Sequence, residues 1–188
     1  LTHEACAPAV SLLHQTGLDK ASLGCDLLVA GVPFNPQDLR VVTVDFGWLV
    51  LLAAILPQAD ATTVLQHLRL SRAEEKFCGQ LAQSNPAQIF AELSAPNWRQ
   101  SAFYMDGRAA AYYACAAWRL GEILRPQHYQ LLHQWQAPQL PISGADLLSH
   151  GVDNGPALGQ MLRGAETLWV QSDFTLTKPA LLAAVVTR

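Results

Sequence analysis

The side chains that could carry catalytic chemistry are sparse in this 188-residue chain and do not stand at catalytic spacings. His3 and Glu4 begin a string like the H-E-x-x-H zinc motif, but Ala7 occupies the position of the second histidine. His128 and His133 are five residues apart, which places them on different sides of a helix. A nucleophile elbow, a P-loop and two acidic residues separated by one position do not occur in the sequence. We therefore expect no catalytic residue and no metal ligand here.

The densest group of basic residues has the chemistry to contact phosphates. It consists of Arg69, Arg72 and Lys76. Lys and Arg beside phosphates supply much of the affinity of proteins for RNA backbones, with little reading of bases. Glu74 and Glu75 lie among these cations, so a solvated surface or local ion pairs is the alternative interpretation.

The distribution of charge favours the middle of the chain as the RNA face. Twelve Lys and Arg against 15 Asp and Glu give a formal net charge of -3, which excludes the strongly basic classes of nucleic-acid-binding protein. Residues 1–68 carry two basic and six acidic residues, whereas residues 69–125 carry seven basic and five acidic. Any contact with nucleic acid must therefore be local.

A second set of candidate anion contacts lies in residues 140–182, where glycines adjoin helix starts. Ser143 is placed to cap a helix that starts at Gly144, with Asp146 returning a hydrogen bond. Gly151 is expected to leave that helix in a left-handed conformation. Pro141 precedes the whole arrangement. Because the amide groups at a helix start attract anions, Ser143 and Gly144 are candidate phosphate contacts.

The second helix start of this segment is marked by Gly155, followed by Pro156 at the first helical position. Gly155 is a third candidate phosphate contact for the same reason. Gly159, one turn further on, removes side-chain bulk from the helix surface. The alternative is that both helices are simply capped and that their glycines allow close packing. One helical stripe, which must pack on a neighbouring element, contains Leu158, Leu162, Ala165 and Trp169.

Apolar residues recur at helical spacing almost everywhere, and strand-like alternation is nearly absent, so the expected fold class is all-α. We expect a bundle-like helical body over residues 1–136 and a small helical tail over residues 137–188, joined by a proline-containing connector over residues 137–142. Capping residues, prolines and glycines predict helices over residues 8–16, 45–56, 60–68, 71–83, 86–93, 108–124, 126–135, 144–149, 156–170 and from 178 onward.

The aromatic side chains of the body stand at helical intervals and are predicted to be core residues rather than platforms for stacked bases. They are Trp98, Trp118, Trp135, Tyr104, Tyr112, Tyr113 and Tyr129.

The composition, 51% apolar and 14% charged, predicts a well-buried chain. The four cysteines show no zinc-binding or CxxC spacing and are expected to be reduced, as in the cytoplasm. The longest apolar stretch, residues 46–57, is too short to cross a membrane, so we expect a core helix and no membrane contact.

The segment from Leu140 onward resembles the C-terminal region of bacterial tRNA nucleotidyltransferases, the class of CCA-adding enzymes that includes bacterial poly(A) polymerase. Proteins of this family often carry P-x-x-G-x-D-L followed by G-x-x-x-G-P-x-[IL]-G. The matching positions are Pro141, Gly144, Asp146, Leu147, Gly151, Gly155, Pro156, Gly159 and Leu162, with Trp169 following in the same order. The L-R-L-S string at residues 68–71 and the apolar helix before it are similar to the family's body.

The resemblance implies that the chain is a fragment, the RNA-binding body and tail of a longer protein that begins before Leu1. Such proteins carry a head with a D-x-D pair that holds magnesium and a neck that reads ATP and CTP, and neither motif occurs in this sequence. The implied partners are the acceptor and TΨC arms of tRNA and the head and neck domains. Catalysis is therefore expected to be absent from these residues alone. Addition of poly(A), or a helical protein-interaction module without an RNA role, are the alternatives.

Overall fold

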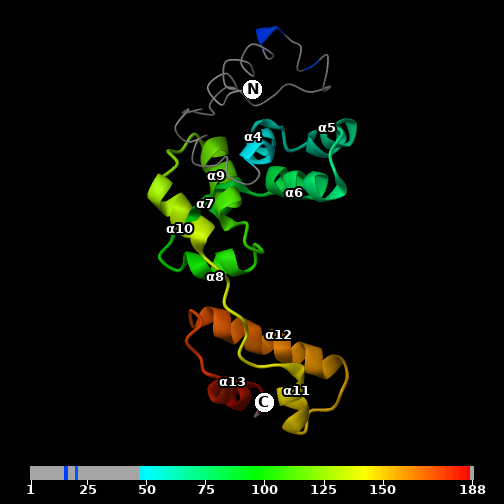
Figure 1. Cartoon of the computed structure of the whole chain (residues 1–188), viewed down its shortest axis with the longest axis vertical. Helices are drawn as coiled ribbons and strands as arrows, with labels where there is room; N and C mark the ends of the chain where they lie inside the picture. The colour runs from blue at the N-terminus through cyan, green and yellow to red at the C-terminus, as the bar shows by residue number, and fades with distance from the viewer. Residues whose placement is uncertain (1–14, 17–19, 21–46, 187–188) are drawn as a thin grey trace. The chain divides into compact units, whose positions relative to one another are not determined.

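The computed structural model describes residues 15–16, 20 and 47–186, and within these ranges every regular element is a helix, with no strand (Figure 1). The prediction of an all-α fold is confirmed. The expected helix over residues 8–16 and the start of the one over 45–56 lie outside the described residues, apart from positions 15 and 16. The helices are α4 (Gly47–Ile55), α5 (Ala61–His67), α6 (Arg72–Gln83), α7 (Pro86–Ser94), α8 (Trp98–Phe103), α9 (Ala109–Leu120), α10 (Pro126–Gln134), α11 (Gly144–Ser149), α12 (Pro156–Gln171) and α13 (Lys178–Val186).

The helices form two compact units. The first includes residues 47–95 and 108–135, and the second includes residues 96–107 and 136–186. The boundary expected between body and tail, after residue 136, is one residue from the position where the chain passes from the first unit to the second for the last time, between residues 135 and 136. The excursion over residues 96–107 belongs with the second unit, so a division into two contiguous segments does not describe the chain.

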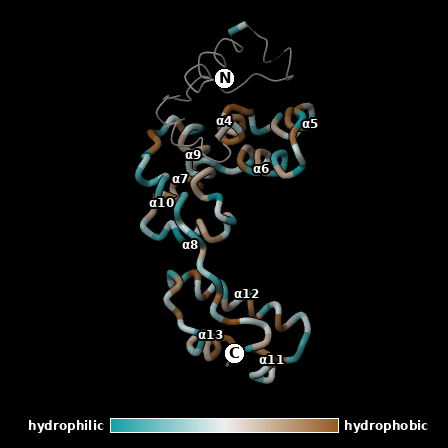
Figure 2. The backbone as a smooth tube through the Cα atoms, viewed as in Figure 1, coloured by the Kyte–Doolittle hydropathy of each residue, from teal (hydrophilic) through white to brown (hydrophobic). Residues whose placement is uncertain are grey.

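The first unit is built around α4 and α9. Along α4, Leu49 and Ala53 are fully buried, as is Leu56 just after the helix, which agrees with a helix that has no polar face (Figure 2). Small residues fill the middle of α9, and two of its large side chains, Tyr113 and Trp118, are each 1% exposed. Alanine side chains let neighbouring helices approach closely, so α9 packs against α4, α6, α7 and α10.

One half-buried cation, Arg119 near the end of α9, joins three helices of this unit. Its Nη2 donates to the carbonyl oxygen of Leu56 at 2.7 Å, and its Nη1 donates to the carbonyl oxygen of Ala82 at 2.5 Å. These carbonyls stand at the C-terminal ends of α4 and α6, where the last turn lacks hydrogen-bond partners and the helix dipole is negative. Arg119 therefore satisfies two helix ends with one side chain.

The second unit has a separate core, formed by α11, α12 and α13. It contains Ile142, Leu147, Ala165, Trp169, Leu181, Leu182 and Val185. Leu158 and Leu162 pack against this core, so the stripe expected along α12 is confirmed. Phe103 of α8 also packs against it, which explains why residues 96–107 group with the second unit.

Two helix predictions for residues 96–124 are corrected by the structure. The helix expected over residues 108–124 ends at Leu120, because Gly121 adopts the left-handed conformation (φ +71°) that terminates helices. The short helix α8 is not foreseen by the sequence, since six residues show no clear period. Asp60 precedes α5 as expected, but its side chain makes no capping hydrogen bond with the described residues.

No helix among the described residues is long and apolar enough to cross a membrane.

We expect replacement Arg119→Ala to lower the free energy of unfolding by about 3 kcal/mol, because hydrogen bonds from a charged donor contribute about 1.5 to 3 kcal/mol each. The measurement is urea unfolding followed by circular dichroism. Arg125→Ala is the matched control, since Arg125 is exposed and caps no helix end with its side chain among the described residues. It should change stability by no more than about 0.5 kcal/mol. Equal losses in the two variants would refute this role of Arg119.

Candidate nucleic-acid interface

The capping box at the start of α6 positions the basic group. The Ser71 amide donates to the Glu74 carboxylate at 2.8 Å, and the Glu74 amide donates to the Ser71 hydroxyl at 3.3 Å, as the sequence predicts. This box fixes Arg72 as the first residue of α6. Lys76 follows one turn later on the same side of the helix, since residues four apart are neighbours on a helix surface. Arg69 lies just before, in the turn between α5 and α6.

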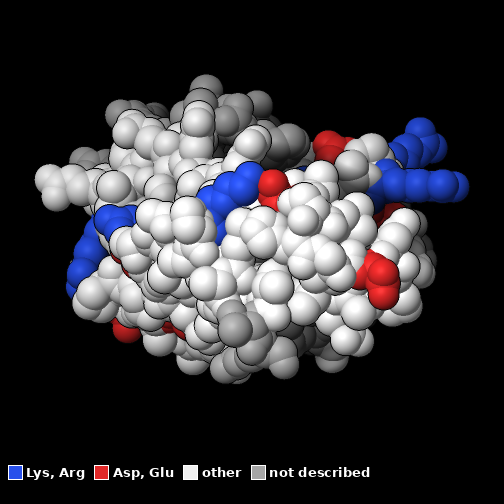
Figure 3. Space-filling model, turned by 90° about the horizontal axis from the view of Figure 1, so that it is seen from below, with Lys and Arg blue, Asp and Glu red and all other residues white. Residues whose placement is uncertain are grey.

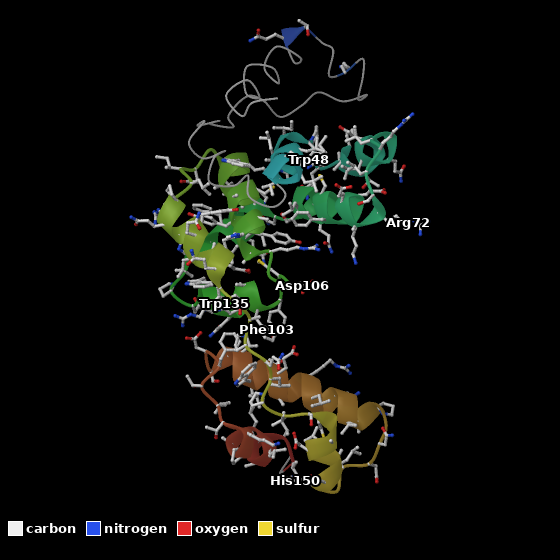
Figure 4. The ribbon with its side chains drawn as sticks, in the orientation of Figure 1. Trp48, Arg72, Phe103, Asp106, Trp135 and His150 are labelled. Carbon is white, nitrogen blue, oxygen red and sulfur yellow. The ribbon has the colours of Figure 1, made fainter. Side chains whose placement is uncertain are left out.

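All three cations of this basic edge, Arg69, Arg72 and Lys76, are exposed. Figure 4 shows Arg72 extending away from α6, and Figure 3 shows cationic side chains standing at separate places on a mostly uncharged face. None of the three forms an ion pair with another described residue. Hydrogen bonds from Ser71 turn Glu74 toward the helix start and lower the pKa of its carboxyl. Local ion pairing is therefore not observed at this edge, whereas a purely solvated surface remains the alternative to RNA contact.

The start of α11 is closed by its own carboxylate. Asp146 Oδ2 accepts from the Ser143 amide and from the Ser143 hydroxyl, each at 2.9 Å, and Asp146 Oδ1 accepts from Lys178 Nζ at 2.6 Å. The ion pair to Lys178 and these hydrogen bonds lower the pKa of Asp146 from 3.8 to about 2. A negative charge thus occupies the place where a phosphate would meet Ser143 and Gly144. The geometry favours the capping interpretation over anion binding for these two residues.

The start of α12 is open. Gly155 is extended (φ 166°), and no side chain of the described residues caps the helix that begins at Pro156. A Cβ atom added at Gly155 would meet nothing within 4 Å, so close packing does not explain this glycine. Gly151 has the left-handed φ of +85° that the sequence predicts. Gly155 therefore stays a candidate phosphate contact.

The remaining family-like positions are structural. Pro141 is partly buried in the irregular segment before α11, next to Ile142 of the second core. Trp169 is 4% exposed in the same core. Gly159 lies beneath the Arg163 side chain, whose Nη1 would be 3.8 Å from an added Cβ atom.

The aromatic side chains divide into core and surface residues. The core prediction is confirmed for the buried side chains of Trp98, Trp118, Tyr113 and Tyr129. Tyr112 and Trp135 are partly buried. The prediction is wrong for Tyr104, which is 60% exposed because α8 ends there and the chain turns through Asp106 and Gly107, both at positive φ. The Asp106-Gly107 dipeptide is typical of turns and could have predicted this one from the sequence.

The cysteines and acidic residues offer no reactive site within the described part of the chain. Cys78 and Cys115 are free and buried, and burial raises the pKa of each thiol to about 12, so both act as small apolar residues. Cys6 and Cys25 lie outside the described residues. No three His, Cys, Asp or Glu side chains of the described residues stand close enough together to hold a metal ion.

Comparison with known proteins identifies the family of this chain. Residues 40–185 match the family model of tRNA nucleotidyltransferase domain 2. The chain is 28% identical over 144 residues to the mitochondrial CCA tRNA nucleotidyltransferase 1 of Mus musculus and 29% identical to that of Homo sapiens. Each alignment covers 73% of this chain but 32% of the relative, so the chain spans about a third of their length.

The fold and the family match define a helical domain of the nucleotidyltransferase class. Because the match covers most of the chain, the chain belongs to the tRNA nucleotidyltransferase domain 2 family. The matched range includes the basic edge and both glycine-marked helix starts, and the match confirms the family that the sequence resembles.

The cap at α11 generates a prediction for acid unfolding. The folded-state pKa of Asp146 is lowered, so its carboxylate stabilises the second unit fully above about pH 4, and this contribution disappears as the pH falls toward 2. We expect Asp146→Asn to unfold at lower urea concentration than the unaltered chain at pH 7, with the difference shrinking between about pH 4 and pH 2.

The matched control for this experiment is Asp153→Asn, which removes an exposed carboxylate from the loop before α12. It should leave the urea midpoint close to that of the unaltered chain at every pH. A constant difference between Asp146→Asn and the unaltered chain down to pH 2 would contradict the assigned cap.

Proposed function

We propose that this chain is the RNA-binding helical part of a tRNA nucleotidyltransferase that adds CCA to the 3′ ends of tRNA. The body would hold the acceptor and TΨC region of the tRNA through its phosphates, while the neighbouring head and neck domains of the same protein carry out nucleotide addition. The membership of the family supports the class of parent protein. The names of both relatives favour CCA addition over poly(A) addition.

The observation that carries the RNA-binding proposal is the unpaired basic edge. Arg69, Arg72 and Lys76 are exposed, free of ion pairs with the described residues, and placed within about two helical turns of each other. Arg119, Arg99 and Lys178 are, in contrast, engaged with groups of the protein itself. Cations without internal partners are the ones that can exchange counterions for phosphates.

Under this proposal magnesium, ATP and CTP are bound by the head and neck domains of the longer protein. The described residues include no cluster of acidic side chains, histidines or cysteines that fits a metal ion. No step of nucleotide transfer is therefore derived from the described residues. A cytoplasmic location is likewise proposed from the sequence, whereas the names of the two relatives call them mitochondrial.

Binding of tRNA at low salt tests the basic edge. We expect the double variant Arg69→Glu, Arg72→Glu to bind tRNA at least about tenfold more weakly than the unaltered chain. The slope of log affinity against log salt concentration should fall by about one for each phosphate that the variant no longer neutralises. Electrophoretic mobility shift and fluorescence anisotropy measure both quantities.

Arg125→Glu, compared with the single variant Arg72→Glu, is the charge-matched control, because Arg125 is exposed in the same unit but stands outside the basic edge. An equal loss of affinity in the control would mean that net charge alone drives binding. Unchanged affinity in the Arg69 and Arg72 variant would refute the proposed surface and favour a protein-interaction module.

A further inference from the structure

Tyr104 is the most exposed aromatic side chain of the second unit, and its backbone is firmly held. The ring is 60% exposed, and Phe103 packs edge-on against it at 5.2 Å between ring centroids. Phe103, labelled in Figure 4, packs in turn against Trp169 at 6.1 Å and against Phe174 at 5.5 Å. The exposed ring therefore rests on the aromatic edge of a folded core.

Two polar contacts hold α8, which ends just before Tyr104, against the end of α12. Arg99 Nη1 pairs with Asp173 Oδ2 at 2.7 Å, and Gln100 Nε2 donates to the Gln171 carbonyl oxygen at 3.3 Å. The backbone next to Tyr104 is thus held in place before any ligand arrives. Preorganisation of this kind reduces the entropy lost on binding.

Helix α12 carries one acidic residue that acts electrostatically on Tyr104, and a basic residue lies one turn earlier in the same helix. Burial raises the pKa of the Tyr104 hydroxyl, and the negative charge of the partly buried Glu166 raises it further. Arg163 lies three residues before Glu166, on the same side of α12, and is exposed. Its guanidinium extends over Gly159, toward the start of the helix, because that position has no side chain.

We propose that Tyr104 stacks on an unpaired nucleobase of a bound RNA strand, with Glu166 accepting a hydrogen bond from the exocyclic amino group of that base and Arg163 contacting the adjoining phosphate. This inference rests on the proposed RNA-binding function and adds a single-stranded subsite to it. Aromatic rings bind unpaired bases by stacking, and carboxylates accept from base amino groups.

The negative charge of Glu166 favours a nucleobase over a phosphate as the group that contacts Tyr104. A phosphate beside Tyr104 would meet the Glu166 carboxylate, so the ring suits a base rather than the backbone. Adenine, cytosine and guanine carry an exocyclic amino group, whereas the one N–H donor on the pairing edge of uracil lies between two carbonyl oxygens that the carboxylate would repel. The subsite therefore favours an amino-bearing base over uracil.

Binding of short oligoribonucleotides to the 188-residue chain tests the subsite. The probes are fluorescently labelled hexamers of A, C and U, measured by anisotropy at low salt. We expect A and C hexamers to bind the unaltered chain several-fold more tightly than U hexamers. Tyr104→Leu, which keeps apolar volume but removes the aromatic face, should weaken binding of the A hexamer by about fivefold or more, and Tyr104→Phe should retain it.

The variant Glu166→Gln separates base recognition from stacking. It should bind the U hexamer nearly as tightly as the A hexamer, since an amide both donates and accepts. Equal affinity of the unaltered chain for the A, C and U hexamers, or equal affinity of Tyr104→Leu and Tyr104→Phe for the A hexamer, would overturn the inference. Circular dichroism in the far ultraviolet confirms that each variant is folded.

The inference and the proposed function fail in different ways. Loss of tRNA binding in the Arg69 and Arg72 variant, together with no effect of Tyr104→Leu on the hexamers, removes the subsite and leaves the basic edge. No binding of tRNA or hexamers by the unaltered chain removes both.

Discussion

The first unit depends on the hydrogen bonds that the guanidinium of Arg119 donates, because every packed helix needs partners for the carbonyl groups of its last turn. The last carbonyl groups of a helix have no partner within the helix, and burying them unpaired costs free energy. Arg119 supplies donors to Leu56 and Ala82, at the ends of α4 and α6, from a position on α9. The central helix thus both fills the core with small side chains and closes the ends of two neighbours.

In the second unit the groups that need partners are the amide N–H groups at a helix start, and a carboxylate accepts from them. Asp146 accepts from Ser143 at the start of α11 and pairs with Lys178 at the start of α13. Only 14% of the residues are charged, and some of the cations bind groups of the protein itself while others do not. Arg99, Arg119 and Lys178 hold the fold together, while Arg69, Arg72, Lys76 and Arg163 stay exposed without ion pairs among the described residues.

The aromatic side chains also divide into buried and exposed residues, and helical spacing predicts burial on long helices but not on short ones. Tyr113 and Trp118 are buried as their helical spacing predicts, because a periodic stripe on a long helix has one face to bury. Tyr104 stands at the end of a six-residue helix, where no period exists. Its exposure follows from the turn at Asp106 and Gly107 and from the docking of α8 on α12.

By itself the sequence determined the fold class, most helix boundaries, the capping box at Ser71, the left-handed glycine at position 151 and the family, since these depend on local spacing and on motif residues. Only the tertiary structure decided that residues 96–107 join the second unit, that Lys178 pairs with Asp146 and that Arg119 caps two helices. These contacts join residues 32 to 74 positions apart, as between Arg99 and Asp173. Local propensity acts over a few residues, so pairings at such separations are set by how the helices pack.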